Sequence, residues 1–350
     1  MSRFFSEKYA FLTPYTPGEQ PQDRKYIKLN TNESPFPPSA KAIQRACEEA
    51  ERLQLYSDPE CRGLTDLLAE TLGVEKEEVL LTNGSDEILN FAFMAYCDDT
   101  HPAAFPDITY GFYPVFAEIN RIPYLEIPLR EDLTINIQDY CGIGKTIFLA
   151  NPNAPTGIAL KRTEIEEILK ANPNNVVVID EAYVDFGAES CVGLIHQYDN
   201  LLVTQTFSKS RSLAGARLGF GVGCASLIRD LNAIKYSTNP YNINRMTMAA
   251  GIGVLSDEKY TRANCRTIME NRAVTCRELK KLGFEFPDSC ANFIFARHPA
   301  VSGQKLYETL KERGILIRHF DKNRIRDYIR ITVGSMEQMQ ILIDTLKEII

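Results

Sequence analysis

The chain has 350 residues, of which 44% are hydrophobic and 24% are charged, and its formal net charge is −7. This composition is typical of a well-packed globular protein and excludes a disordered one; at this length we expect one large domain and a smaller one. The negative charge argues against non-specific binding to nucleic acids or anionic membranes, so any site for an acidic small molecule must be local.

Cysteine usage and apolar runs favour a cytoplasmic protein. The nine cysteines include no CxxC pair and do not form the pattern of a disulfide framework, which indicates a reducing compartment. The first segment, MSRFFSEKYAFLTPYTPGEQ, lacks the apolar core of a secretion signal, and no apolar run approaches the roughly 18 residues of a membrane span. We therefore expect no secretion and no membrane partner.

The first part of the chain alternates short apolar runs with helical segments. Residues 1–38 form a predicted irregular arm, because their prolines favour extended geometry, and a helical pattern begins at Ser39. The expected strands are 79–82, 103–105, 146–150, 176–180 and 201–206. One intervening helical segment, TEIEEILKA, contains a capping-box pair, Thr163 and Glu166. Strands that alternate with helices predict a mostly parallel α/β sheet with helices on both faces.

The pattern changes after about residue 235. Longer amphipathic helices cover 245–282, and three short strand-like pieces, NFIFAR, GILIRHF and YIRITVG, precede a final helix from Ser335. These elements predict a smaller α+β domain that packs tightly on the first, because no long linker separates the two. The predicted organisation is an N-terminal arm (1–38), a large domain (39–240) and a small C-terminal domain (241–350).

Polar residues follow the predicted strands at the end where ligands bind to open parallel sheets. NGSDE, PDITY, NPNAPTG, DEAY and FSK each come after one of the five runs. Gly84 and Ser85 at a helix start can hold a phosphate through backbone N–H groups, or can simply cap the helix. Asp180 ends a β-branched strand and needs a cation, which Lys209 can supply as a structural ion pair or as a functional group. Spacing alone leaves both alternatives open.

Several motifs together resemble a known family. NPNAPTG, VVIDEAYVDF and FSKSRSLAGARLGF, in this order and at these spacings, resemble the aspartate-aminotransferase superfamily, the fold type I group of pyridoxal-phosphate enzymes. The segments LNTNESPFPP, LYSDPECRGL, TNGSDEIL, PDITYGFY and YIRITVG are similar to histidinol-phosphate aminotransferases of the short bacterial type. The resemblance covers residues 12–334. It implies a large domain with a mostly parallel sheet, a smaller α+β domain, pyridoxal 5′-phosphate as cofactor, and a homodimer with a shared active site.

The resemblance also implies roles around the cofactor ring. Lys209 would form an imine with the cofactor aldehyde and then transfer protons, since only an amine forms a reversible Schiff base. Asp180 would pair with the pyridinium nitrogen, and Tyr183 and Asn153 would bond to the phenolate oxygen. The sequence departs from the commoner motif at Ala154, where many relatives have a second Asn, and we infer that Asn153 is the ligand.

The cofactor phosphate is implied to lie at the helix start that follows the first strand. Its expected ligands are Gly84, Ser85, Asp86 through its backbone, Thr206, Ser208 and Arg217. An arginine suits this role because its planar guanidinium can make two bonds to a phosphate. Tyr110 would stack on the pyridine ring, and Tyr56 resembles a tyrosine that reaches the phosphate from the partner subunit.

For the substrate, the resemblance implies four residues from the two ends of the chain. They are Tyr15, Asn32, Arg318 and Arg330. They would bind the phosphate of histidinol phosphate and, in the other half-reaction, the carboxylates of glutamate or 2-oxoglutarate. Read singly, each arginine is better explained as a solvated charge at a strand edge.

The implied reaction is a transamination of histidine biosynthesis, in which glutamate aminates the cofactor and the cofactor passes the group to imidazole-acetol phosphate, giving histidinol phosphate. An aromatic aminotransferase and a threonine-phosphate decarboxylase share nearly all cofactor residues and stay open as alternatives. A non-enzymatic regulator is disfavoured because Lys209 and Asp180 are both present and no DNA-binding segment is seen. The four histidines lack ligand spacing, so no metal is expected. Arg211 receives no assignment.

Overall fold

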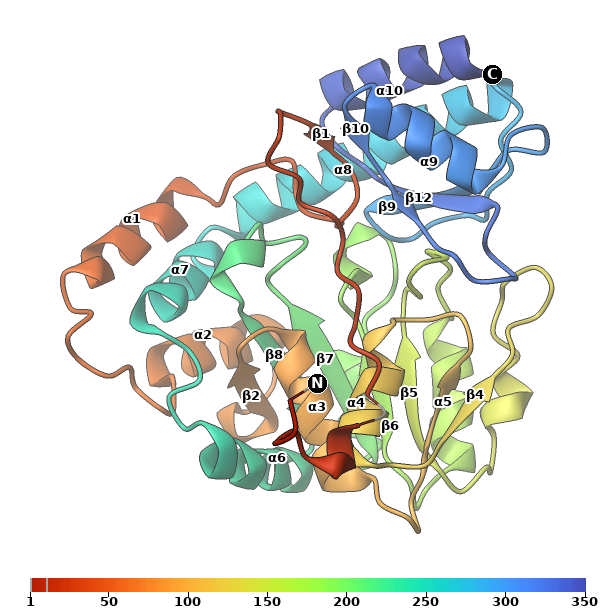
Figure 1. Ribbon diagram of the computed structural model, residues 1–350. Coiled ribbons are helices and arrows are strands. Elements are labelled where there is room, and N and C mark those ends of the chain that lie inside the picture. Colours follow the sequence, from red (N-terminus) through yellow and green to blue (C-terminus); the bar gives the residue numbers. More distant parts are fainter. Residues whose placement is uncertain (1, 11) are drawn as a thin grey trace.

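The computed structural model describes residues 2–10 and 12–350, so Met1 and Phe11 of the predicted arm lie outside the described residues. Its largest sheet has seven strands in the order β2-β8-β7-β6-β5-β3-β4 (Figure 1). The strands are β2 (Val79–Thr82), β3 (Ala103–Pro106), β4 (Tyr124–Ile127), β5 (Thr146–Ala150), β6 (Val177–Asp180), β7 (Leu201–Thr206) and β8 (Gly219–Gly223). Strand β8 is antiparallel to both of its neighbours, and the other pairs are parallel. The predicted mostly parallel α/β sheet is confirmed.

Helices cover both faces of this sheet. Because successive residues of a strand point to opposite faces, each strand contributes side chains to both helical layers. In β6, Val177 and Ile179 pack on one helical layer and Val178 packs on the other. One layer contains α2 (Arg62–Leu72), α5 (Arg162–Ala171) and α7 (Arg245–Leu255), with α1 (Ala40–Ala50) against α7. The other contains α3 (Ser85–Tyr96), α4 (Phe112–Asn120) and α6 (Ala225–Thr238). With both faces buried, each central strand contains a continuous apolar run, and the buried polar residues lie at or near the strand ends.

A second, antiparallel sheet with the order β11-β12-β9 lies above the first in Figure 1. Its strands are β9 (Phe293–Arg297), β11 (Arg318–His319) and β12 (Tyr328–Thr332). A separate core joins it to α8 (Glu258–Lys281), α9 (Gly303–Glu312) and α10 (Met336–Ile349). The domain boundary at residue 240 stays a prediction; α7, on its C-terminal side, packs on α1 and α2, whereas α8 packs with the second sheet.

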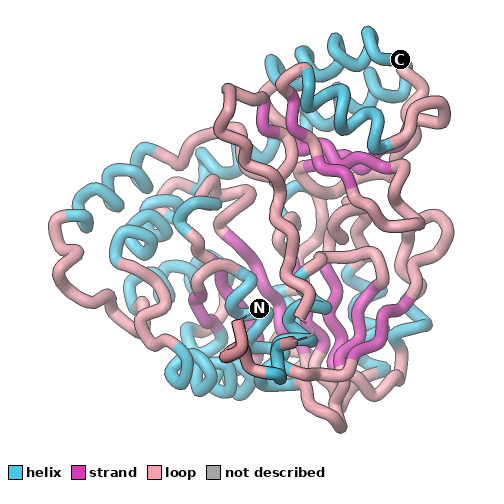
Figure 2. The backbone as a smooth tube through the Cα atoms, viewed as in Figure 1, coloured by secondary structure: helices cyan, strands magenta, loops and turns pink. Residues whose placement is uncertain are grey.

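The N-terminal arm connects the two sheets. Strand β1 (Ile27–Lys28) pairs in parallel with β10 (Ile315–Leu316) beside the second sheet. From there the arm runs as a loop across the front of the large sheet toward the N-terminus (Figure 2). Short 3₁₀ turns occur at η1 (Glu7–Tyr9), η2 (Lys76–Glu78), η3 (Ile137–Tyr140), η4 (Val184–Phe186), η5 (Val192–Leu194) and η6 (Ala214–Ala216).

Four local features differ from the sequence prediction. Strand β1 lies within the arm that was predicted to be irregular. Strands β4 and β8 were not predicted: three of the four β4 residues are exposed at the sheet edge, and β8 is interrupted by glycines. The predicted capping box at Thr163 and Glu166 is wrong, because α5 begins earlier, at Arg162, and the Glu164 carboxylate accepts from Lys161 N at 2.7 Å.

Two further findings concern the whole described chain. Across residues 2–10 and 12–350, no helix is both long and apolar enough to cross a membrane. The nine cysteines are free thiols.

Candidate active site

A pocket opens where the carboxyl ends of β6 and β7 meet the start of α3. It is lined by Ser85, Asp86, Tyr110, Ala150, Ala154, Asp180, Ala182, Tyr183, Thr206, Ser208, Lys209 and Arg217. Parallel strands end at one edge of a sheet, which is why segments far apart in sequence converge there. Most of the residues assigned to a cofactor in the sequence therefore lie together.

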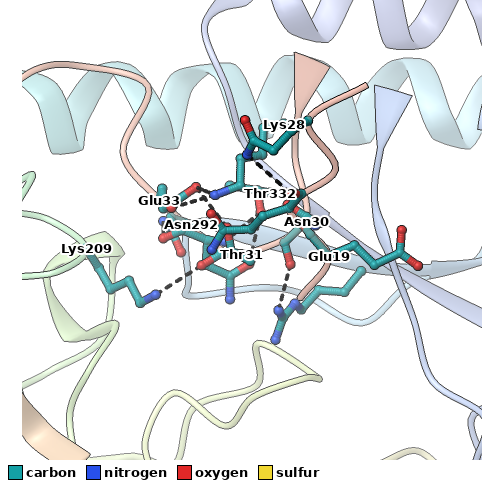
Figure 3. Close-up of polar contacts among 12 residues, drawn as sticks. Glu19, Lys28, Asn30, Thr31, Glu33, Lys209, Asn292 and Thr332 are labelled. Carbon is teal, nitrogen blue, oxygen red and sulfur yellow. Dashed lines mark hydrogen bonds and ion pairs between the residues drawn. The ribbon is translucent and has the colours of Figure 1, made fainter. Parts of the chain in front are cut away.

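Lys209 follows β7 and extends into this pocket toward the N-terminal arm (Figure 3). Its Nζ donates a hydrogen bond to the Thr31 carbonyl oxygen at 3.1 Å. Burial lowers the pKa of Lys209 to about 8, and the positive charge of Arg330 acts in the same direction. Among the described residues Lys209 forms no ion pair with Asp180, so the structural ion pair left open by the sequence is not formed. A half-neutral amine near pH 8 can act as a nucleophile and a base.

Asp180 ends β6 and is 4% exposed. Its carboxylate accepts hydrogen bonds from the Tyr113 hydroxyl at 3.2 Å and the Thr204 hydroxyl at 3.3 Å. Burial nevertheless raises the pKa of Asp180 to about 6. A buried carboxylate with only neutral donors is best stabilised by a cation, and a protonated pyridine nitrogen fits that need. The sequence analysis did not identify Tyr113 or Thr204 as hydrogen-bond partners of Asp180. Tyr113 lies three residues after Tyr110, a predicted cofactor residue, and its hydroxyl was the available indication.

The N-terminus of α3 forms the opposite end of the pocket. Gly84 has φ +77°, and a Cβ there would lie 2.5 Å from Arg217 Nη2, so only glycine lets the guanidinium approach the helix start. Arg217 Nη2 also lies 2.8 Å from Asp86 Oδ2, while the Tyr110 hydroxyl donates to Asp86 Oδ1 at 2.6 Å. Free N–H groups of a helix start beside a guanidinium make a site suited to a phosphate.

Two hydroxyl residues complete this end. Thr206 Oγ1 lies 3.0 Å from Ser208 Oγ and accepts from Ser208 N at 3.1 Å. Both side chains are buried on the pocket wall, where their remaining hydrogen-bonding capacity can serve an anion. The structure thus brings together the predicted phosphate ligands.

Tyr183 connects the pocket to the arm. Its hydroxyl accepts a hydrogen bond from Asn32 Nδ2 at 3.0 Å, and Asn32 Oδ1 in turn accepts from the Thr332 hydroxyl at 3.1 Å. Asn292 Nδ2 donates to the Asn32 carbonyl oxygen at 3.0 Å (Figure 3). Asn32 N also donates to the Thr332 hydroxyl at 2.9 Å, so four hydrogen bonds hold Asn32, with φ +56°, in a conformation that asparagine tolerates better than most residues. These contacts fix the position of the Tyr183 hydroxyl.

The two C-terminal arginines line a larger adjoining cavity of about 640 Å³, together with Tyr15, Asn32 and Lys209. Arg318 donates to the Thr16 and Pro17 carbonyl oxygens at 2.8 and 3.0 Å. Arg330 Nη2 donates to the Asn30 carbonyl oxygen at 3.2 Å, whereas its Nε is buried and has no partner in the described part of the chain. The predicted substrate residues thus meet in one cavity, where the Arg330 guanidinium has no ion-pair partner among the described residues.

Tyr15 lies in the same cavity on an aromatic wall. Its ring stacks on Phe112 with centroids 4.2 Å apart, and the Tyr110 ring lies 6.4 Å from Tyr15 and 5.7 Å from Phe112. Burial raises the pKa of the Tyr15 hydroxyl, which stays a neutral hydrogen-bond donor at physiological pH. The sequence reasoning did not identify Phe112 as part of this wall.

Two predicted cofactor residues lie elsewhere. Asn153 is buried, and its side chain bonds to the Ile108 carbonyl oxygen at 3.0 Å and to the hydroxyls of Thr109 and Thr156, while Ala154 lines the pocket. Tyr56 is 80% exposed and stacks on Tyr241 outside the pocket of its own chain. The predicted roles of Asn153 and Tyr56 stay predictions.

Sequence comparison identifies the family. Residues 24–346 match the family model described as aminotransferase class I and II. The chain belongs to this family. A protein of Marinomonas sp. (strain MWYL1) named histidinol-phosphate aminotransferase is 50% identical to this aminotransferase over 351 residues, covering 99% of each chain. A protein of the same name from Brachyspira hyodysenteriae (strain ATCC 49526 / WA1) is 47% identical over 353 residues, covering 100% of this chain and 99% of the relative.

A solved structure has the same architecture as this aminotransferase. The crystal structure of histidinol-phosphate aminotransferase from Sinorhizobium meliloti in complex with pyridoxal-5′-phosphate matches it with a TM-score of 0.91. The match covers 100% of this chain and 99% of that chain at 21% sequence identity. The fold type I architecture implied by the sequence is confirmed.

Proposed function

We propose that this aminotransferase interconverts histidinol phosphate and 2-oxoglutarate with imidazole-acetol phosphate and glutamate, with pyridoxal 5′-phosphate as its cofactor. The observation that carries the proposal is the Arg330 guanidinium, which lines the cavity that also contains Lys209 and Arg318 and forms no ion pair among the described residues. An arginine without a carboxylate partner at the wall of a cavity favours an anionic ligand, and every substrate of this reaction is an anion. The names of the two relatives described above support the same reaction.

The pocket fits pyridoxal phosphate at both ends. The Asp180 carboxylate, which lacks a cationic partner among the described residues, would hold the protonated ring nitrogen. The start of α3, Thr206, Ser208 and Arg217 would hold the phosphate. When bound, the cofactor supplies an aldehyde that takes up an amino group and a ring that withdraws electrons from the substrate carbon.

The residues of the chain supply binding and proton transfer. Lys209 would hold the cofactor covalently at rest and, once released, would carry a proton at Nζ between the two sides of the reacting carbon. Its lowered pKa keeps a useful fraction of the amine neutral at physiological pH. Asn32 holds the Tyr183 hydroxyl, which would bond to the ring oxygen of the cofactor, while Arg318 and Arg330 would bind the substrate phosphate or the glutamate carboxylates in turn.

We further propose that the protein is cytoplasmic and that it forms a homodimer in which each active site is shared by the two subunits. Leu53, Leu55, Tyr56 and Tyr241 are between 44% and 80% exposed, and the two tyrosines stack with centroids 4.6 Å apart. Apolar and aromatic residues gathered on a surface favour burial against another protein, and the symmetric association of two copies is the commonest such arrangement. Tyr56 would then reach the phosphate end of the partner's pocket.

A half-reaction titration tests the proposed reaction. Purified protein loaded with pyridoxal phosphate is mixed separately with histidinol phosphate, glutamate, phenylalanine and threonine phosphate, and the cofactor absorbance is followed. Conversion to the aminated cofactor by histidinol phosphate and glutamate is expected. Conversion by phenylalanine with equal efficiency would indicate an aromatic aminotransferase, and release of carbon dioxide from threonine phosphate would indicate a decarboxylase.

A further inference from the structure

Two segments that carry active-site residues contact each other behind the pocket. The first begins at Asp180, the last residue of β6, and contains Tyr183; the second follows β7 and contains Lys209. Asp185 Oδ2 in the first segment accepts a hydrogen bond from the Ser210 hydroxyl and lies 3.5 Å from Arg211 Nη1 in the second. One carboxylate therefore contacts the two residues that directly follow Lys209.

Arg211 is held in place by aromatic rings. Its guanidinium carbon lies 5.0 Å from the centroid of Phe207 and 5.7 Å from that of Phe220, within the range of cation–π attraction. Its Nη1 lies 3.5 Å from the Thr206 carbonyl oxygen, and its side chain is only 11% exposed. Such enclosure is unusual for a surface charge and shows that Arg211 is part of a fixed arrangement.

The backbone between β7 and β8 needs such support. Residues 207–213 form a tight turn in which Ser212 has φ +57°, a conformation that costs energy for a serine. Its backbone hydrogen bonds run from Phe207 N to Leu218 O at 2.9 Å, from Leu213 N to Phe207 O at 3.0 Å and, within the turn, from Ser212 N to Lys209 O at 3.4 Å, and none of the three reaches the segment after β6. Ser210 and Arg211 are thus the side chains that tie the middle of the turn, next to Lys209, to the segment after β6.

We propose that Asp185 and Arg211 are positioning residues that set the location of Lys209 relative to Asp180 and Tyr183. Neither side chain lines the pocket, so they act through the backbone of Lys209. The inference rests on the proposed function, in which Lys209 must reach the cofactor aldehyde that Asp180 and the phosphate site hold in place. A displacement of about 1 Å in such a geometry can slow a reaction about a hundredfold.

The test measures covalent capture of pyridoxal phosphate by cofactor-free protein as a function of pH, which needs no substrate. The variants are Asp185→Asn, Arg211→Met, Arg211→Lys and the double variant Asp185→Asn/Arg211→Met. Arg297→Met is the matched control. Like Arg211, Arg297 contacts a carboxylate, that of Glu285 at 2.7 Å, and an aromatic ring, that of Tyr328 at 5.4 Å. It does not contact the segment that contains Lys209 and lines neither the pocket nor the adjoining cavity. Thermal unfolding of each variant is measured in parallel.

We expect Asp185→Asn and Arg211→Met to slow capture by about tenfold or more and to shift its pH midpoint, while the control behaves as wild type. Arg211→Lys should restore part of the rate, and the double variant should be no slower than the slower single variant, because both act through one contact. Wild-type rates and midpoints in folded Asp185→Asn and Arg211→Met would overturn the proposal, even if their unfolding temperatures fall. If the wild-type protein itself fails to capture the cofactor, the proposed function fails instead.

Discussion

The Lys209 amine donates a hydrogen bond to the Thr31 carbonyl oxygen, 3.1 Å away, so the N-terminal arm contacts the lysine that follows β7. We predict that Lys209→Ala folds but loses covalent cofactor attachment, because Lys209 is the only lysine among the described residues that line the pocket near Asp180. Absorbance spectra after dialysis check this. Lys235→Met removes another buried lysine, which bonds to the Pro59 carbonyl oxygen, and should keep the wild-type spectrum. A pH-sensitive cofactor band that persists in dialysed Lys209→Ala would refute the assignment.

Asp180→Asn should leave cofactor binding nearly intact but lower the rate of amino transfer by at least about a hundredfold, since an amide cannot keep the ring nitrogen protonated. Single-turnover kinetics with glutamate separate this effect from binding. Tyr113→Phe, which removes only one of the hydrogen bonds to Asp180, should have a much smaller effect. Equal rate losses in the two variants would argue against a special role for the carboxylate.

Arg330→Ala should raise KM for histidinol phosphate by about 10- to 100-fold, the range of one charge-assisted hydrogen bond. The Kd of the cofactor should change less than about twofold. Steady-state kinetics and a cofactor titration give the two values. Arg324→Ala, which removes an arginine paired with Asp107 at 2.7 Å, serves as a control for loss of charge. Parallel losses of substrate and cofactor affinity would contradict the assignment.

The buried Glu181 gives stability a pH dependence. Its carboxylate accepts from Cys191 N, Ser190 Oγ and Gln205 Nε2, yet burial raises its pKa to about 7 from an ordinary value of 4.5. The folded state therefore holds this proton more tightly than the unfolded state, so stability from this group is fully present below pH 4.5 and is lost as pH rises through 7.

Glu181→Gln should remove that decline, reducing the slope of unfolding free energy between pH 5 and 7 by up to about 1.4 kcal/mol per pH unit. Urea unfolding of cofactor-free protein at several pH values measures the slope. Glu70→Gln, on the exposed side of α2, should keep the wild-type slope. An unchanged slope in Glu181→Gln would mean that Glu181 is already ionised at pH 5.

Subunit mixing tests whether Tyr56 completes the site of a partner. Tyr56→Ala and Lys209→Ala should each be nearly inactive, but refolded together they should recover about a quarter of wild-type activity, because each mixed dimer has one site free of both changes. Tyr236, another exposed tyrosine, supplies the control. Refolding Tyr236→Ala together with Lys209→Ala should give no activity beyond that of the Tyr236→Ala subunits themselves. Absence of recovery would place Tyr56 outside the neighbouring site.

The central strands and their terminal polar residues could be predicted because burial on both faces leaves continuous apolar runs that end abruptly. The exposed edge strand β4 has no such run, and β8 could not be assigned because its glycines, needed for close approach to α3, obscure the strand pattern. Pairings across the molecule were also out of reach: the bond from Tyr113 to Asp180 joins residues 67 positions apart, and no local pattern encodes it.

The side chain of Asn153 illustrates a second limit. Its motif placed it at the cofactor, but three neighbours in the fold, Ile108, Thr109 and Thr156, occupy its hydrogen-bonding groups. Arg211 had no assignment from the sequence, because its proposed role depends on its contact with Asp185 in the folded chain. Residue type and order indicate the chemistry of a site, whereas the direction of each side chain depends on packing.

The path of the arm has a practical consequence for protein engineering. Strand β1 is anchored to β10, and the residues after it reach both Tyr183 and Lys209, so deleting the first 34 residues to shorten the protein would remove one wall of the site. An affinity tag is better placed after Ile350, which follows α10 in the upper part of Figure 1 and lines neither the pocket nor the adjoining cavity.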